Sequence, residues 1–186
     1  VDRLVNLNLT EAEKSDWRNI QPGHIVQFNQ NVSSIDRGSR WTVYDSSDNC
    51  IFIRDSIGEI STLPVSRSNV YDVYTKNQMP LAKGDLVRVT RNGFDHDKKR
   101  LNNGQLLRVK RIDEERISLV NEQSKTAYRL NRDHGHINHA YCITSHASQG
   151  KTVDHVLIAQ PADTFPATSA KQFYVSVSRG RDQASI

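Results

Sequence analysis

Short hydrophobic runs separated by polar turns dominate most of the chain. From residue 24 to residue 74 these runs are rich in Val, Ile, Phe, Tyr and Thr, and turn clusters such as "DRGSR", "DSSDN" and "DSIGE" divide them. Runs of this kind, with turns about every ten residues, are typical of a compact antiparallel sheet or a small barrel. Ahead of them, Thr10 and Glu13 have the spacing of a capping box, which predicts a short helix. We therefore expect residues 1–78 to form an N-terminal helix and a small antiparallel β domain.

A second set of short hydrophobic runs follows the stretch "QMPLAKG". It begins with "DLVRVTRN", continues through "GQLLRVKRID" and "RISLVNE", and ends with "TAYRL". Polar turns again separate the runs, so we expect residues 79–133 to form a second small β domain. The two sets resemble each other too weakly to indicate an internal repeat.

The pattern changes after residue 133. The stretches "HAYCIT" and "VDHVLIA" predict two apolar strands, and a polar segment lies between them. The final "QASI" resembles the first half of a strand, which suggests a piece cut from a longer protein. We expect residues 134–186 to be part of an α/β domain, and the fold class to be α+β and β-rich.

A helix is expected between these last strands. Ser169 and Gln172 repeat the capping-box spacing, and the residues from Ser169 to Arg181 place Phe173 and Val177 four positions apart on one side. The β-branched residues of this segment also fit a strand, so the strand stays open as an alternative.

Composition and charge limit the class of protein. Hydrophobic residues make up 36% of the chain and charged residues 25%, and no apolar run approaches the roughly 20 residues that span a bilayer. No basic and apolar leader is seen at the N-terminus, so we expect a cytoplasmic protein without membrane insertion. Cys50 and Cys142 form no C-x-x-C pair, which argues against a disulfide framework or a zinc cluster, and we expect both to be buried.

The net charge of +4 permits a polyanionic partner without requiring one. Basic residues crowd two places: Lys98, Lys99, Arg100, Arg108, Lys110 and Arg111, and then Arg179 and Arg181. Solvated surface charge explains such clusters equally well.

The stretch "SHASQGKT" ends like a nucleotide-binding P-loop but is not predicted to be one. Ser145 stands where a P-loop needs glycine, and the apolar residues from Val153 onward leave no room for the long helix that a P-loop opens. No later apolar strand ends in an acidic residue that would bind magnesium. We expect no independent ATP site.

The spacing of the histidines gives little support for a metal site or for a catalytic triad. His134, His136 and His139 lack an acidic or cysteine partner at ligand spacing, so we expect a polar loop and no metal site. Ser148, His146 and Asp154 can be assembled into a hydrolase-like triple, but the chain has no nucleophile elbow.

Two polar motifs at the ends of apolar elements are better candidates. Thr144, Ser145, His146 and Ser148 carry hydroxyl and imidazole donors suited to the phosphate oxygens of a nucleic-acid backbone. Arg179, 31 residues after Ser148, offers a planar guanidinium that can meet a phosphate with two hydrogen bonds. Either motif alone is equally well explained as a turn or as a solvated helix end.

In this order the motifs resemble those of superfamily 1 helicases of the RecD-like branch. "TSHASQGKTVDHVLI" resembles motif V of that branch, and "QFYVSVSRGR" resembles motif VI. "KGDLVRVTRNGFD" and "LNNGQLLRVKRID" resemble the segment that leads into an SH3-like barrel inserted in the second RecA-like domain. "NLNLTEAEKSDWRNIQPGHIVQFN" resembles conjugative relaxase-helicases of the MobF class. The resemblance implies an SH3-like (2B-like) insertion at 79–133 and part of a second RecA-like domain at 134–186.

The resemblance also assigns roles to single residues. Thr144, His146 and Ser148 match positions that contact single-stranded DNA, and Arg91 and Asn92 lie in the segment expected to add DNA contacts. Gln149 and Gly150 match the turn that couples the DNA site to the nucleotide site. Arg179 matches the arginine finger, with Arg181 as a second candidate. Lys151 and Gly180 depart from the residues that are common in the family at these positions.

The chain contains no Walker A or Walker B motif and no relaxase signature. The resemblance therefore implies the C-terminal part of one helicase unit, which binds single-stranded DNA but hydrolyses no ATP alone. It needs no cofactor itself, whereas ATP and Mg²⁺ belong to the parent protein, whose remaining domains are its expected partners. Trp41, Phe94, Tyr128 and Tyr174 are candidate surfaces for stacking of bases, with core packing as the alternative.

Two other functions stay open. The barrel-like insertions can be a protein-docking and translocation-signal module that a type IV secretion coupling protein recognises. The chain can equally come from an ATPase-dead helicase copy that only holds single-stranded DNA.

Overall fold

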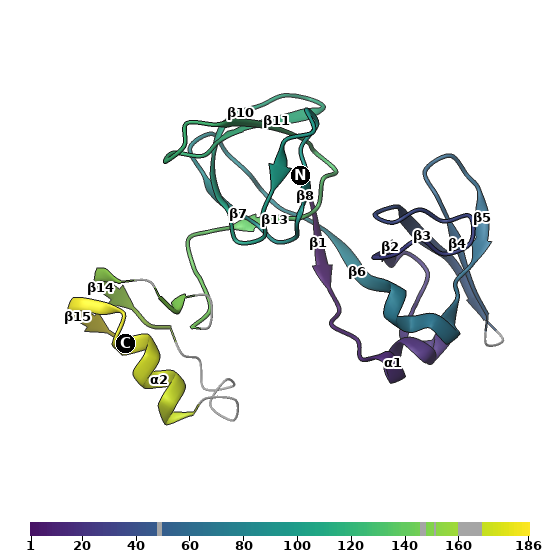
Figure 1. Cartoon of the computed structure of the whole chain (residues 1–186), viewed down its shortest axis with the longest axis horizontal. Coiled ribbons are helices and arrows are strands. Elements are labelled where there is room, and N and C mark those ends of the chain that lie inside the picture. Colours follow the sequence, from purple (N-terminus) through teal and green to yellow (C-terminus); the bar gives the residue numbers. More distant parts are fainter. Residues whose placement is uncertain (48–49, 146–147, 151, 160–168) are drawn as a thin grey trace. The chain divides into compact units, whose positions relative to one another are not determined.

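The computed structural model describes residues 1–47, 50–145, 148–150, 152–159 and 169–186, which divide into two compact units (Figure 1). Unit 1 is Val1–His139 and unit 2 is Ala140–Ile186. Unit 1 is built mainly from two antiparallel sheets, whereas the described part of unit 2 contains one helix and a parallel strand pair. The predicted β-rich α+β class is therefore confirmed.

The first sheet of unit 1 has six antiparallel strands. Their spatial order is β1 (Asp2–Asn6), β6 (Tyr71–Gln78), β2 (Ile25–Phe28), β3 (Arg40–Ser47), β4 (Cys50–Arg54) and β5 (Ile60–Thr62). Side chains alternate in direction along β4, so Ile51 and Ile53 are fully buried while Cys50, Phe52 and Arg54 face outward. Each buried aliphatic side chain of this kind stabilises the fold by about 1.5–3 kcal/mol.

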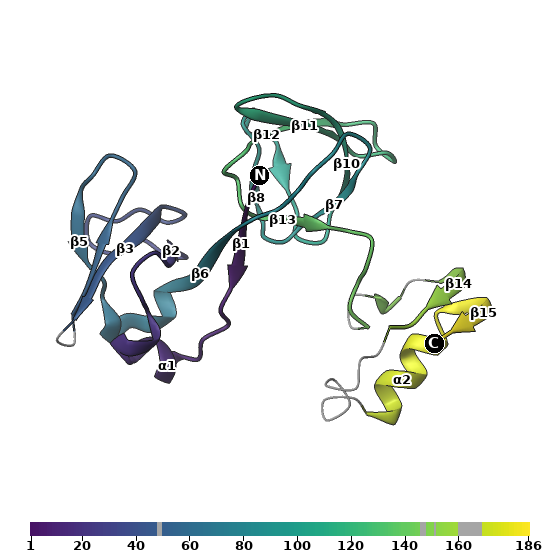
Figure 2. The same cartoon turned by 180° about the vertical axis from the view of Figure 1, so that it is seen from behind.

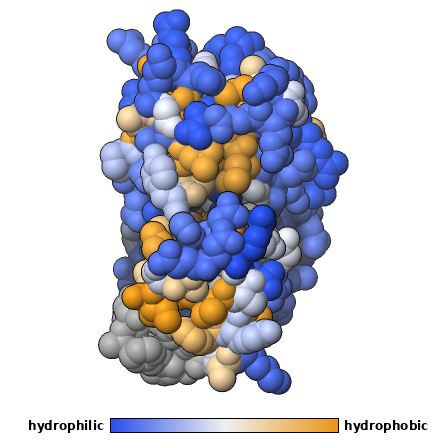
Figure 3. Space-filling view, turned by 90° about the vertical axis from the view of Figure 1, so that its left-hand side faces the viewer, coloured by the Kyte–Doolittle hydropathy of each residue, from blue (hydrophilic) through white to orange (hydrophobic). Residues whose placement is uncertain are grey.

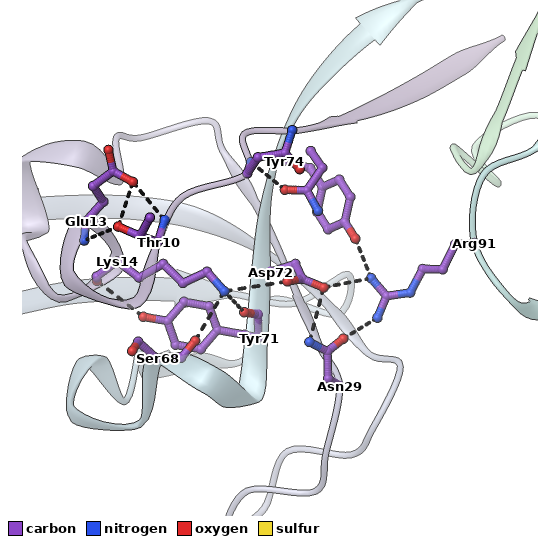
Figure 4. Close-up of polar contacts among 11 residues, drawn as sticks. Thr10, Glu13, Lys14, Asn29, Ser68, Tyr71, Asp72, Tyr74 and Arg91 are labelled. Carbon is purple, nitrogen blue, oxygen red and sulfur yellow. Dashed lines mark hydrogen bonds and ion pairs between the residues drawn. The ribbon is translucent and has the colours of Figure 1, made fainter. Parts of the chain in front are cut away.

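The predicted N-terminal helix is confirmed, including its cap. Helix α1 (Glu11–Ser15) is followed by the 3-10 helix η1 (Trp17–Asn19), and a second 3-10 helix, η2 (Val65–Val70), precedes β6. The backbone N–H of Thr10 donates to Glu13 Oε2 at 2.7 Å and Glu13 N donates to Thr10 Oγ1 at 3.3 Å (Figure 4). The buried Lys14 ammonium donates to the carbonyl oxygen of Tyr71 at 2.6 Å, which fastens α1 to β6.

The second sheet of unit 1 has five strands. Their spatial order is β12 (Ala127–Asn131), β11 (Arg116–Val120), β10 (Leu106–Ile112), β7 (Leu86–Val89) and β13 (Ile137–His139). A separate hairpin joins β8 (Gly93–Phe94) to β9 (Arg100–Leu101). The strands curve around a hydrophobic core of their own (Figure 2), which includes Val87, Leu107 and Leu119. Each hydrophobic run predicted between residues 85 and 130 contains a strand.

Polar contacts from several elements connect the two sheets of unit 1. Arg40 on β3 donates to the carbonyl oxygens of Asp133 at 2.8 Å and His134 at 2.5 Å. Gln27 on β2 is hydrogen-bonded to the buried His136 ring at 2.5 Å. Strand β1, which pairs with β6, also bonds through Leu4 N to the carbonyl oxygen of residue 135 at 2.9 Å.

Three local expectations are wrong. "HAYCIT" was expected to form a strand, but only its first residue does: β13 ends at His139, the last residue that pairs with β7. Cys50 and Cys142 are exposed, because Cys50 falls on the outward phase of β4 and Cys142 lies outside any described strand. The polar loop expected at "HGHINH" is instead partly strand, and His136 is buried by its contact with Gln27.

Unit 2 is a strand–helix–strand arrangement. β14 (Val153–Leu157) pairs in parallel with β15 (Gly180–Ser185), and α2 (Ala170–Val177) lies between them in sequence. The helix is confirmed over the strand alternative, and Ser169 Oγ accepts from Gln172 N at 3.2 Å as its cap. The two strands expected at residues 153–159 and at the end of the chain are confirmed as well.

Much of the hydrophobic surface of unit 2 is exposed. Leu157 is 83% exposed and Tyr174 is 72% exposed. Hydrophobic side chains are visible on the surface beside the grey atoms in Figure 3. None of the described residues of unit 2 is fully buried, so these elements do not enclose a core by themselves. No helix in the described part of the chain is long and apolar enough to cross a membrane.

The stability of the chain is expected to depend on the protonation of two histidines. Burial, reinforced by the nearby Arg40 guanidinium, lowers the pKa of His134 to about 4 and that of His136 to about 3. An unfolded imidazole keeps its usual pKa of 6.5, so below that pH the unfolded chain binds protons that the folded chain refuses. The free energy of unfolding should keep its full value above pH 6.5 and should fall progressively as the pH is lowered towards 4.

Urea unfolding at a series of pH values measures this effect. The double variant His134→Gln, His136→Gln should lose stability less steeply over this range than the unchanged chain. A double variant with the same pH dependence as the unchanged chain would contradict the assignment.

Candidate functional site

A hydrogen bond in unit 2 brings the two predicted motifs together. Gln172 Nε2, in the first turn of α2, donates to Ser145 Oγ at 2.6 Å. Ser145 lies in the segment that precedes β14, so 27 residues of sequence separate the two partners. Ser145 is therefore attached to the N-terminal end of α2.

A hollow of about 760 Å³ lies beside this hydrogen bond, entirely within unit 2. Its polar lining includes Thr144, Ser145, Ser148, Gln172, Ser176 and Arg179. Its apolar lining includes Tyr141, Ile143, Val153, Val156, Phe173 and Ile186. The lining of the hollow thus combines hydroxyl groups and a guanidinium with aromatic and aliphatic side chains.

Arg179 is held at the junction of α2 and β15. Its Nε donates to the carbonyl oxygen of Val175 at 3.0 Å, and its Nη2 donates to Ser178 Oγ at 3.0 Å. Its own carbonyl oxygen accepts from Val153 N at 2.9 Å, at the start of β14. These bonds fix the half-buried arginine between the helix and the strand that follows the first motif.

The first motif forms a turn ahead of β14. Ser148 N donates to the carbonyl oxygen of Thr144 at 3.1 Å, and Ser148 Oγ donates to the carbonyl oxygen of Ser145 at 2.6 Å. Gln149 is exposed, and Gly150 has a φ of 74°, a conformation that glycine adopts without strain. His146 and Lys151 lie outside the described residues.

The expectation that "SHASQGKT" is not a P-loop agrees with the element that follows it. A P-loop opens a helix, whereas Val153 begins strand β14. Among the described residues, no group of His, Cys, Asp or Glu side chains is arranged to hold a metal ion.

Arg181 occupies a more exposed position than Arg179. Its Nη2 lies 3.6 Å from Asp154 Oδ1, and both side chains are about two-thirds exposed. An exposed ion pair of this kind contributes little to stability. Arg181 and Asp154 lie on paired strands, so their contact is at the same end of the β14–β15 pair as Arg179.

Arg91 and Asn92 lie in unit 1 and are engaged in contacts there. The Arg91 guanidinium bonds to Tyr74 Oη and Asn29 Oδ1 and lies 3.4 Å from Asp72 Oδ2 (Figure 4). Asn92 Oδ1 accepts from the backbone N–H of residue 103 at 2.7 Å. Their role in DNA contact stays a prediction, and the structure adds a second role for Arg91 in joining the loop after β7 to β6.

The four candidate stacking aromatics divide into two groups. Trp41 and Tyr128 are buried in the cores of unit 1, where the alternative of core packing applies. Phe94 is 63% exposed and Tyr174 is 72% exposed. Tyr141, which also lines the hollow and is 64% exposed, is not among the site residues expected from the sequence, where "HAYCIT" predicts an apolar strand.

Comparison with known proteins supports a helicase relationship for unit 2. A family model of the UvrD-like helicase C-terminal domain matches residues 139–186. This match coincides with unit 2 and includes both polar motifs. No curated protein matches the chain. The segment that resembles motifs V and VI is therefore similar to the C-terminal part of a superfamily 1 helicase.

The close packing at Gly180 leads to a testable prediction. A Cβ added to Gly180 would lie 2.5 Å from the carbonyl oxygen of Gln183 and 3.0 Å from Val156 Cγ1. Gly180→Ala should therefore loosen the β14–β15 pair and cost about 1–3 kcal/mol. Limited proteolysis of the full chain measures this loosening as faster cleavage within unit 2.

Gly93→Ala is the matched control, because a Cβ at Gly93 meets no atom within 4 Å. Equal cleavage rates for the two variants would show that the close contact at Gly180 does not constrain unit 2.

Proposed function

We propose that this chain is the single-stranded DNA-binding, C-terminal part of an ATP-dependent DNA helicase. The parent would belong to the RecD-like branch of superfamily 1, with the helicase region of MobF-class conjugative relaxases as the nearest type. The observation that carries the proposal is the Ser145–Gln172 hydrogen bond beside a hollow that Thr144 and Arg179 both line. This geometry lies within the segment that matches the UvrD-like helicase C-terminal domain.

The segment before β14 is the proposed DNA side of the site. Thr144 and Ser148 line the hollow, and a hydroxyl can donate to a phosphate oxygen without regard to base sequence. For Ser148 the phosphate oxygen would replace the carbonyl oxygen of Ser145, to which its Oγ donates at 2.6 Å. His146 is proposed to add an imidazole donor to the same strand of DNA. Gln149 and Gly150 form the turn that links this side to β14.

Arg179 is the proposed nucleotide side. In the parent helicase it would act as an arginine finger towards an ATP γ-phosphate held with Mg²⁺ by another domain, where a guanidinium stabilises the negative charge of the transition state. Arg181 is the second candidate for contact with the nucleotide. Neither ATP nor Mg²⁺ is proposed to bind this chain alone.

A closed path of contacts supports coupling between the two sides. Ser145 is bonded to Gln172 at the start of α2, Arg179 follows the end of α2, and its carbonyl oxygen is bonded to Val153. An eight-residue helix spans about 12 Å, so a displacement of the DNA-side segment reaches the arginine through one short rigid element.

The proposed fold assignment follows from the strand directions. Parallel strands joined through a helix are typical of α/β domains, which supports a RecA-like origin for unit 2. For the second sheet of unit 1 we propose an SH3-like barrel inserted in that domain.

Binding of single-stranded DNA is the first test. Fluorescence anisotropy with a labelled oligothymidine should show an affinity that falls as salt rises, because contacts to phosphates release counterions. Thr144→Val should weaken binding by about 2- to 10-fold, the range for losing one hydrogen bond. Thr42→Val, which changes an exposed hydroxyl on β3 of unit 1, away from the hollow, is the matched control. An affinity indifferent to salt, or equal losses for both variants, would contradict the proposal.

ATP turnover is the second test. The isolated chain should hydrolyse no ATP, with or without DNA. In the parent helicase, Arg179→Lys should lower the rate of ATP hydrolysis by about 10³- to 10⁵-fold while single-stranded DNA binding persists. Turnover by the isolated chain that survives both Arg179→Ala and Lys151→Ala would require a different nucleotide site.

A protein-docking module is the second candidate function. Tyr44, Phe52 and Ile60 are 54%, 37% and 56% exposed on adjacent strands at the β5 edge of the first sheet, which favours a surface that contacts another protein. A type IV secretion coupling protein is the proposed partner. Binding of the purified coupling protein that is lost in Tyr44→Ser, Phe52→Ser would support this candidate, and unchanged binding would argue against it.

A further inference from the structure

The hairpin β8–β9 carries an exposed aromatic ring opposite a cation. The strand register places Phe94 directly across from Arg100, so their side chains lie on one face of the hairpin. The neighbouring Leu101 is fully buried, which turns Arg100 outward, and Phe94 is 63% exposed. An aromatic face and a guanidinium are therefore presented together to solvent.

The hairpin is fastened to the barrel by its acidic residues. The buried carboxylate of Asp95 accepts from the backbone N–H groups of Asp97 and Lys99, both at 2.8 Å, and from that of Arg129 at 3.1 Å. Asp97 forms an ion pair with the Arg129 guanidinium, and His96 N donates to the carbonyl oxygen of Arg129 at 2.8 Å. These contacts hold the turn rigidly against β12.

The same contacts leave the outer face of the hairpin positively charged. Both hairpin carboxylates are occupied, whereas Lys98 and Arg100 are exposed and form no ion pair within the described part of the chain. Lys98 has a φ of 64° at the turn. An exposed aromatic ring flanked by two cations on a rigid support is the combination that holds single-stranded nucleic acid, with bases stacked on the ring and phosphates at the cations.

We infer that the β8–β9 hairpin is a second binding site for single-stranded nucleic acid, with Phe94 stacking on a base and Arg100 and Lys98 contacting phosphates. This inference rests on the proposed function, since it adds to unit 1 a binding site for the same class of ligand. The proposed contacts come from the hairpin and not from Arg91, because the Arg91 guanidinium is bonded to Tyr74 and Asn29.

The experiment measures binding of labelled oligothymidine and oligouridine to the full chain by fluorescence anisotropy over a range of salt concentrations. Phe94→Ala should weaken binding by roughly 5- to 100-fold, as expected for loss of one base–aromatic stack, and Phe94→Tyr should restore it. Arg100→Gln should lower the slope of log affinity against log salt concentration by the amount expected for about one phosphate contact. Phe94→Ala should leave this slope unchanged. Tighter binding of oligothymidine would identify DNA as the ligand, and tighter binding of oligouridine would identify RNA.

Two controls separate stacking from general effects. Tyr44→Ala removes an exposed aromatic ring that also has an arginine beside it, since Arg54 Cζ lies 4.9 Å from the Tyr44 ring centre, and it should leave binding unchanged. An abasic oligonucleotide should bind Phe94→Ala and the unchanged chain equally, because it offers no base to stack.

The outcomes distinguish this inference from the proposed function. Loss of affinity in Phe94→Ala with none in Thr144→Val would support the hairpin and contradict the DNA side of unit 2. Loss in Thr144→Val with none in Phe94→Ala would overturn the hairpin site alone. Equal losses in Phe94→Ala and Tyr44→Ala, or no binding by the unchanged chain at low salt, would also overturn it.

Discussion

The parallel pairing of β14 with β15 is the constraint on which the candidate site depends. Parallel neighbours cannot be joined by a tight turn, so the chain returns through α2 before β15 begins. The hydrogen bond from Val153 N to the carbonyl oxygen of Arg179 then places the starts of both strands side by side. Since one polar motif precedes each strand, this pairing alone brings them to the same end of the pair. The Ser145–Gln172 bond adds the second link and closes the path around the helix.

The two sheets of unit 1 are connected by polar contacts, whereas the candidate site in unit 2 depends on the direction of its strands. Each of its two sheets has its own hydrophobic core, and buried or half-buried polar side chains connect them. Such groups are costly to leave unpaired, so the arrangement favours one geometry over others. Arg91 illustrates the consequence for function. Its guanidinium is committed to Asn29 and Tyr74, whereas the Lys98, Arg100 and Phe94 side chains of the neighbouring hairpin are exposed, with Arg100 Nε donating to Asn102 Oδ1 at 3.1 Å.

The features that local sequence determines were predictable, and those that depend on distant partners were not. The Thr10–Glu13 cap and the hydrophobic runs of both sheets follow from residues a few positions apart. The burial of His136 depends on Gln27, 109 residues away. Cys50 is exposed because of the phase of β4, which composition does not reveal. For the candidate site, the motifs were recognisable in sequence, but the contact between Ser145 and Gln172 requires the fold.

Hydrogen–deuterium exchange of the full chain, with and without oligothymidine, measures directly whether single-stranded DNA binds each of the two sites: the segment before β14 in unit 2 and the β8–β9 hairpin in unit 1. We expect slower exchange from Thr144 to Gly150 and from Gly93 to Leu101 when DNA is bound, with no change in β3, β4 and β5. Slower exchange confined to those three strands, or no change anywhere, would contradict it.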